Sequence, residues 1–308
     1  MRRIVWALTL AIILLVSVGL INLATANFIA YLPYITIKSD GSIEPETEYI
    51  NQTGNLYTLT KNLPQKYAIT IQRSNIVFEG AGHIINGSAS ILGYSNRGLS
   101  LKDVTNVTIK DIEVCGFIDR DISIENSSKC HILRVNAQIF HLWDSSFNTI
   151  TESNIGDEQL HLLFRYSNNN VIFRNNITAV DLGIGNSNIF FENNFGRKFV
   201  WPVNEANSWD NGSVGNYWSD YFTKYPNASE IGNSGIGDTP YVIDVNNLDN
   251  YPLMAHYTVL PSPSPTPEPQ PEPEPLPVKF VAGAIGISAI IIGIVGLVYF
   301  KTRKKPEG

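Results

Sequence analysis

Short apolar runs separated by polar corners fill the chain from about residue 103 to residue 196. The runs span three to five residues rich in Ile, Val and Phe, which is typical of β-strands rather than helices. Similar segments begin at Asn106, Cys130, Asn148, Asn170 and Asn188, spaced by 24, 18, 22 and 18 residues, and an outlying copy precedes them at Asn75. A period near 20 residues indicates a stacked solenoid.

Superposing these segments produces columns of like residues, which predict an all-β, right-handed parallel β-helix. One inward column lies two positions after each start: Val77, Thr108, Ile132, Ile150, Ile172 and Phe190. A second inward column lies seven positions after it: Ala137, Ile155, Ile177 and Phe195. Shared apolar columns are expected where successive coils bury one continuous core.

Two polar columns flank the inward ones. The first contains Asn136, Asn154, Asn176 and Asn194, and we expect their amides to hydrogen-bond from rung to rung and their backbone to be left-handed. The second contains Lys110, Arg134, Glu152, Arg174 and Glu192, with alternating sign from Arg134 onward. A slipped coil would place like charges together, so we interpret this column as structural and as fixing the register.

A further strand in each coil has the inward pairs Ile122/Ile124, Phe140/Leu142, Leu162/Phe164 and Val180/Leu182. Its outward residues form the chemically richest face of the chain: Asp121, Ser123, Glu125, Ile139, His141, Trp143, His161, Leu163, Arg165 and Asp181. From this face we take Glu125, His141, Trp143, His161 and Arg165 as candidate ligand-binding residues. Asp121 and Asp181 are the candidate catalytic carboxylates.

The ends of the chain have a different composition. Residues 1–26 combine two arginines, a long apolar run and a small-residue end, which predicts a signal peptide; an uncleaved anchor is the alternative. Residues 27–87 are expected to form the N-terminal cap and first coils, residues 88–205 the repeats and residues 206–260 an aromatic C-terminal cap. A proline-rich stalk (261–277), a transmembrane helix (278–300) and a basic cytoplasmic tail (301–308) follow, which places the solenoid outside the cell.

Charge and modification signals agree with this layout. The exterior part has 15 basic and 24 acidic residues, a balance of about −9, so nucleic acid is not an expected partner. Candidate glycosylation sites are Asn51, Asn86, Asn126, Asn211 and Asn227. Cys115 and Cys130 are the two cysteines, and the sequence leaves open whether they form a disulfide.

Several motifs resemble the NosD-type right-handed parallel β-helix family, and in particular its archaeal cell-surface members. They are Tyr34-Ile-Thr-Ile-Lys-Ser-Asp-Gly-Ser-Ile43, Asn75-Ile-Val-Phe-Glu-Gly-Ala-Gly82, Gly215-Asn-Tyr-Trp-Ser-Asp-Tyr221, Gly235-Ile-Gly-Asp-Thr-Pro-Tyr-Val-Ile-Asp244 and Asn250-Tyr-Pro-Leu253. The resemblance covers roughly residues 33–257 and implies a pectate-lyase-like fold, an extracytoplasmic setting and a link to carbohydrate. It also implies copper binding, for which His141 and His161 are the weak candidate ligands.

Two functional hypotheses follow from the outward face. The first is a non-enzymatic surface module that binds polysaccharide or a neighbouring envelope protein, since aromatic rings stack on sugars. The second is a polysaccharide lyase or glycoside hydrolase, although Asp121 and Asp181 are expected roughly 15 Å apart, beyond the spacing of an acid–base pair. No cofactor is expected; calcium at Asp238, Asp244, Asn246 and Asp249 is an alternative to ordinary turns.

Overall fold

The computed structural model describes residues 34–65, 67–87, 97–156, 162–196, 200–201, 206–260 and 263–264. The predicted signal peptide, transmembrane helix and basic tail lie outside these ranges, as does the stalk except for two of its residues. Within the ranges, no helix has the length and hydrophobicity needed to cross a lipid bilayer.

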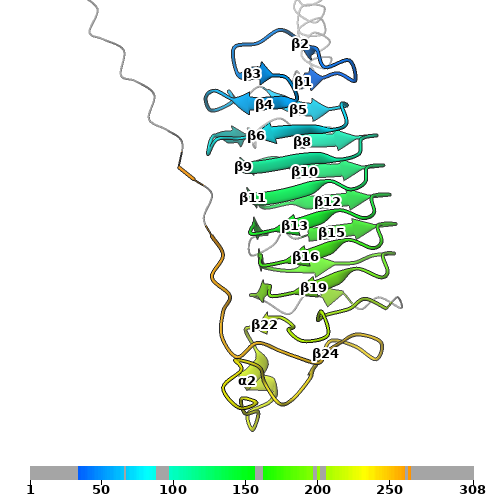
Figure 1. Cartoon of the computed structure of the whole chain (residues 1–308), viewed down its shortest axis with the longest axis vertical. Helices are drawn as coiled ribbons and strands as arrows, with labels where there is room; N and C mark the ends of the chain where they lie inside the picture. The colour runs from blue at the N-terminus through cyan, green and yellow to red at the C-terminus, as the bar shows by residue number, and fades with distance from the viewer. Residues whose placement is uncertain are drawn as a thin grey trace, which may run out of the picture. The chain divides into compact units, whose positions relative to one another are not determined.

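The described chain is an all-β parallel solenoid whose strands stack as rungs (Figure 1). One wall is a nine-stranded sheet, parallel from β1 onward, with β2 antiparallel at its edge. In spatial order its strands are β2 (Ile43–Glu44), β1 (Tyr34–Ile37), β5 (Ala68–Ile71), β8 (Arg97–Lys102), β10 (Arg120–Glu125), β12 (Phe140–Trp143), β15 (Leu162–Arg165), β18 (Val180–Asp181) and β21 (Val200–Trp201).

The other walls belong to a thirteen-stranded sheet that bends at a corner within each coil. Its main path is β22 (Tyr217–Trp218), β20 (Asn194–Phe195), β17 (Asn176–Ile177), β14 (Asn154–Ile155), β11 (His131–Ala137), β9 (Val107–Cys115), β6 (Ile76–Glu79), β4 (Leu56–Leu59) and β3 (Ile50–Thr53). The second arm contains β13 (Thr149–Thr151), β16 (Val171–Phe173) and β19 (Ile189–Phe191), and β7 (Ile84–Asn86) pairs with β9. Among the described strands of this sheet, only β3 and β4 pair antiparallel.

The core consists of the predicted apolar columns, with one correction. Ile132, Ile150 and Ile172 are paired in register and fully buried. In the two earlier coils the predicted inward residues Val77 and Thr108 are wrong, because Thr108 pairs with His131 and not with Ile132. The buried residues there are Phe78 and Ile109. The second inward column and all four inward pairs of the nine-stranded sheet are confirmed: Ala137, Ile155, Ile177, Phe195, Ile122, Ile124, Phe140, Leu142, Leu162, Phe164, Val180 and Leu182.

The same one-residue shift changes the charged column. Asp111, not Lys110, aligns with Arg134, so the signs alternate through every coil of the column. Arg134 Nε lies 2.6 Å from Asp111 Oδ1 and Arg134 Nη1 lies 3.6 Å from Glu152, while Lys110 pairs instead with Glu79. Partly exposed pairs of this kind contribute about 0.2–1 kcal/mol each.

The asparagine column forms the predicted amide ladder, but it is not the left-handed corner. The Nδ2 groups of Asn154, Asn176 and Asn194 donate to the preceding amide oxygen at 2.8, 2.6 and 2.7 Å. These residues lie in β-strands. The positive φ angles belong to the charged column, with φ of 50° at both Arg134 and Glu152.

Beside a short buried ladder of Ser127, Ser145 and Ser167, two longer polar ladders run inside the corners. In each, a backbone N–H donates to the side-chain oxygen of the next coil, and in one of them these acceptors are Asn148, Asn170, Asn188, Asn207 and finally Asn247. In the other they are Ser153, Asn175, Asn193, Asn216 and finally Asp249. Buried backbone donors at the corners are therefore satisfied without a neighbouring strand.

The C-terminal residues cover the last coil with aromatic rings. Trp209 stacks on Phe190 and Trp218 stacks on Phe195, with ring centroids 4.7 and 4.5 Å apart. The indole N–H groups donate to Asn247 and Asp249 of the ladder ends. A one-turn helix, α2 (Tyr221–Lys224), and the antiparallel pair β23 (Tyr241–Val242) and β24 (Leu248–Asp249) complete this region.

Candidate functional site

The outward face of the nine-stranded sheet is covered by polar side chains where it crosses β8, β10 and β12. Ser100, Ser123 and His141 align across these strands and are 7%, 0% and 5% exposed. Ser123 Oγ donates to Ser100 Oγ at 2.9 Å. Outward residues of a sheet are usually solvated, so burial of this column means that longer neighbouring side chains fold over it.

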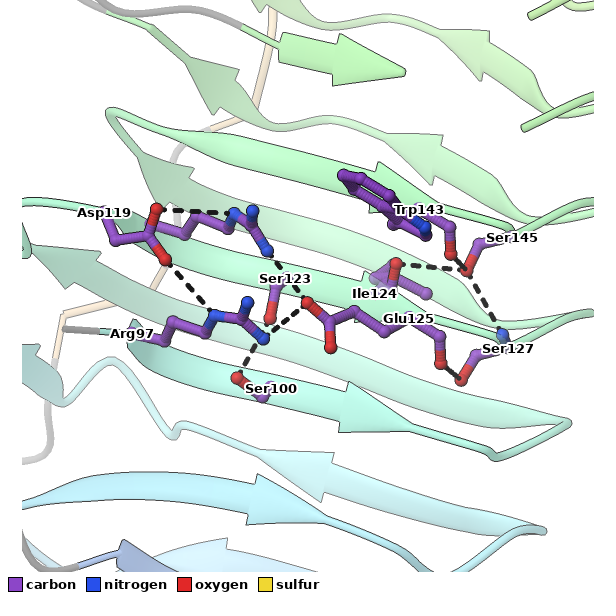
Figure 2. Close-up of polar contacts among 10 residues, drawn as sticks. Arg97, Ser100, Asp119, Ser123, Ile124, Glu125, Ser127, Trp143 and Ser145 are labelled. Carbon is purple, nitrogen blue, oxygen red and sulfur yellow. Dashed lines mark hydrogen bonds and ion pairs between the residues drawn. The ribbon is translucent and has the colours of Figure 1, made fainter. Parts of the chain in front are cut away.

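Two arginines and one glutamate form part of that cover (Figure 2). Arg97 and Arg120 begin adjacent strands in the same register, an arrangement that would be repulsive by itself. Glu125 accepts from Arg97 Nη1 at 2.5 Å and from Arg120 Nη1 at 2.8 Å. Asp119 accepts from Arg97 Nε at 3.3 Å, and Lys102 stands beside Glu125 on the neighbouring strand. The carboxylates thus hold the two guanidinium groups in fixed positions.

A pocket of about 360 Å³ opens on this face. Its lining is Arg97, Lys102, Asp103, Arg120, Glu125, Asn126, Trp143 and Asp144. Three of these side chains are basic and three are acidic, so the lining is rich in hydrogen-bonding groups and close to neutral in total. The volume lies at the small end of the range for ligand sites, about 300–1,000 Å³.

Trp143 supplies the aromatic surface of the pocket. It ends β12 and is 40% exposed. Its ring meets His141 edge-on at 5.7 Å and Tyr166 at 6.1 Å between centroids. Arg165 lies beside Trp143 in register on β15. The indole thus contacts two aromatic neighbours while part of it stays exposed.

His141 is a neutral imidazole inside this cluster. Its Nε2 atom is buried and has no hydrogen-bond partner among the residues that the structure describes. Burial, then the positive charges of Arg120 and Arg165, lowers the pKa of His141 to about 4. Surrounding arginines disfavour a cation, so the residues here do not fit the copper site implied by the resemblance. The other candidate ligand, His161, lies outside the described residues.

The candidate carboxylates do not come together. Asp121 is fully buried and accepts backbone N–H groups from Phe117, Gln138 and Ile139 at 3.1, 2.7 and 3.0 Å. Asp181 lies on β18 and accepts two hydrogen bonds from Arg165, at 2.8 and 3.1 Å. Both residues therefore have clear structural roles in shaping a corner and in joining adjacent strands.

The oxygen-rich run of the C-terminal region also has structural partners. Asp244 accepts from the backbone of Asn246 and the amide of Asn247, and Asp238 accepts from the Ser229 N–H group and the Thr239 hydroxyl. Asp249 is enclosed by the donors at the ladder end. Among the described residues, no group of three or more His, Cys, Asp or Glu side chains is placed to hold a metal ion.

The cysteines and the predicted glycosylation sites occupy different environments. Both cysteines are free thiols, and burial raises the pKa of Cys115 and of Cys130 to about 11. The five candidate asparagines, Asn51, Asn86, Asn126, Asn211 and Asn227, are all exposed. Asn126 differs from the others because its Nδ2 donates to Asp103 at 2.7 Å and the residue lines the pocket.

Sequence reasoning identified Trp143, Glu125, His141 and Arg165 on one face but missed the basic residues of the pocket. The predicted outward face begins at β10, whereas the structure extends it to the earlier strand β8, with Arg97 and Lys102. The segment Arg97-Gly-Leu-Ser-Leu-Lys102 has the same alternation as Arg120-Asp-Ile-Ser-Ile-Glu125, which was the available signal. Comparison with known proteins finds no matching family model, no similar curated protein and no similar solved structure.

Proposed function

We propose that this solenoid is a non-catalytic module of the cell surface that binds polysaccharide through the pocket beside Trp143. The observation that carries the proposal is the exposed indole ring at the edge of a pocket lined by charged and amide side chains. A sugar ring has an apolar C–H face and a rim of hydroxyl groups. The indole offers a stacking surface for the C–H face, and Arg97, Lys102 and Asp144 offer hydrogen bonds to the hydroxyl groups.

The rigidity of the site supports binding rather than chemistry. Trp143 lies on a strand paired on both sides, and Glu125 fixes the two arginines, so little conformational freedom is lost when a ligand docks. Glycoside hydrolysis requires two carboxyl groups about 5–9.5 Å apart around the scissile bond. Asp121 is occupied by backbone donors, and Asp181 is paired with Arg165.

The cellular setting is part of the same proposal. The apolar segments at residues 4–21 and 280–300, with basic residues beside them, support secretion and a single membrane anchor. The parallel solenoid is compatible with the NosD-type resemblance and with its archaeal cell-surface members, and that membership is proposed on the motifs alone. An envelope protein is the alternative partner for the same exposed face.

Binding of the full-length protein in detergent micelles to an array of neutral and acidic glycans tests the proposal. We expect retention of a subset of glycans, with loss of binding in Trp143→Ala. The matched control is Phe222→Ala, which removes a 49% exposed ring in the C-terminal cap and should bind normally. Release of reducing ends or unsaturated sugars would favour an enzyme, and wild-type binding by Trp143→Ala would refute the site.

A further inference from the structure

A left-handed residue follows each of four consecutive strands of the nine-stranded sheet. These residues are Asp103, Asn126, Asp144 and Tyr166, with φ of 56°, 46°, 46° and 52°. The conformation is required by the turn, since every one of these coils adopts it. Asn and Asp tolerate it well, whereas a bulky aromatic residue is an outlier there. Tyr166 therefore occupies a position for which its backbone is poorly suited.

Burial of the Tyr166 side chain does not offset the energetic cost of its left-handed backbone. It is 49% exposed, and its described ring contact is with Trp143 on the preceding coil. Phe147 shares this strain and exposure, so they assign no role by themselves, and the contact with Trp143 is what distinguishes Tyr166. The contact with Trp143 extends the exposed aromatic surface from one coil to the next.

We propose that Tyr166 and Trp143 together form a two-ring platform for an uncharged polysaccharide whose successive sugars follow the stacking direction of the coils. This inference deepens the proposed function and rests on it. The direction follows from the placement of the two rings on adjacent coils, with centroids 6.1 Å apart and ring planes inclined at 62°. The preference for an uncharged chain follows from the pocket lining, where three basic side chains are balanced by three acidic ones.

The test uses Tyr166→Asn, which installs the residue type found at Asn126 of the same column. Relief of the left-handed strain raises the thermal unfolding midpoint by about 2 °C. Loss of the ring weakens binding of long oligosaccharides by about fivefold to tenfold. One substitution thus makes the protein more stable and a poorer binder, a combination that a purely structural role for Tyr166 does not produce.

Phe147→Asn is the matched control. Phe147 is also left-handed, with φ of 61°, and is 60% exposed, while the neighbouring coil has Asn169 at the equivalent position with φ of 55°. This variant should gain the same stability and keep wild-type affinity. Its behaviour separates the effect of backbone relief from the loss of a sugar contact.

The probes are a size series of neutral gluco- and manno-oligosaccharides and the matching uronic-acid series, measured by titration calorimetry on the full chain. We expect the affinity of the wild type to rise with the length of the neutral oligosaccharide, and the affinity of Tyr166→Asn not to rise. Wild-type affinity in Tyr166→Asn, with binding lost in Trp143→Ala, would overturn the two-ring platform alone. Tighter binding of the uronic-acid series would overturn the preference for an uncharged chain, and unchanged binding in both variants would remove the proposed function itself.

Discussion

Replacing His141 with leucine should remove a large part of the acid sensitivity of the fold. The imidazole is 5% exposed, and its pKa is lowered to about 4 by burial and by Arg120 and Arg165, with Arg97 adding to the effect and Asp119 opposing it. An unfolded chain binds the proton at the ordinary value near 6.5. Stability from this histidine is therefore complete above pH 6.5 and is lost as pH falls towards 4.

The size of the effect follows from the separation of the two pKa values. Each unit corresponds to about 1.4 kcal/mol, so the unfolding free energy should fall by about 3 kcal/mol between pH 7.5 and pH 4 through His141 alone. Leucine is compatible with the site because Leu163 occupies the same column on the next strand. His141→Asn is the companion variant: it also lacks the titration, but it keeps a polar group.

Urea unfolding at several pH values between 4 and 7.5 measures the prediction. Both variants should show a shallower loss of unfolding free energy than the wild type, even though their stabilities at pH 7.5 differ from each other. Parallel curves for wild type and His141→Leu would refute the reasoning, because they would mean that the folded protein accommodates the imidazolium as easily as the unfolded chain does.

Three further substitutions, two of them with a matched control variant, probe the ladders, the charged column and the C-terminal cap. Asn175→Ala leaves buried donors and acceptors unpaired and should lower the unfolding free energy by about 3 kcal/mol in urea titrations, whereas Asn176→Ala, at the exposed ladder, should cost under about 1 kcal/mol. Glu152→Lys should destabilise by about 1 kcal/mol at low salt and less at high salt, in contrast to Glu152→Gln. Gly215→Ala would drive a methyl group into Asp249 and should abolish the near-ultraviolet dichroism of the cap; a native spectrum would contradict this.

The sequence predicted the stacking correctly for coils in which the same number of residues separates the corner residue from the buried column. Ile132, Ile150 and Ile172 were placed on one wall because Cys130, Asn148 and Asn170 occupy the same corner position. The earlier coils failed by one residue because the equivalent corner residue there is Val107, an apolar side chain that gives no polar marker. An alignment on asparagine therefore uses the residue before Val107 and shifts the predicted column by one position.

The candidate site was predictable in part for a similar reason. Alternation along β12 placed His141 and Trp143 on the outward face, and that is where they lie. Alternation does not reveal that the face is covered, since the burial of Ser123 depends on arginines whose partner Glu125 is 28 residues from Arg97. Such cover is a property of three coils in space rather than of any one repeat.

Each coil of the buried polar ladders brings one new oxygen for the coil before it and one N–H group for the coil after it. Each coil thus presents the same kind of acceptor to the coil before it and the same kind of donor to the coil after it, and Asn247 and Asp249 end the two longer ladders. A coil copied or deleted as a unit between residues 148 and 193 would leave both ends matched. The length of the solenoid is consequently free to change in whole coils by gene duplication, with the terminal acceptors kept unaltered.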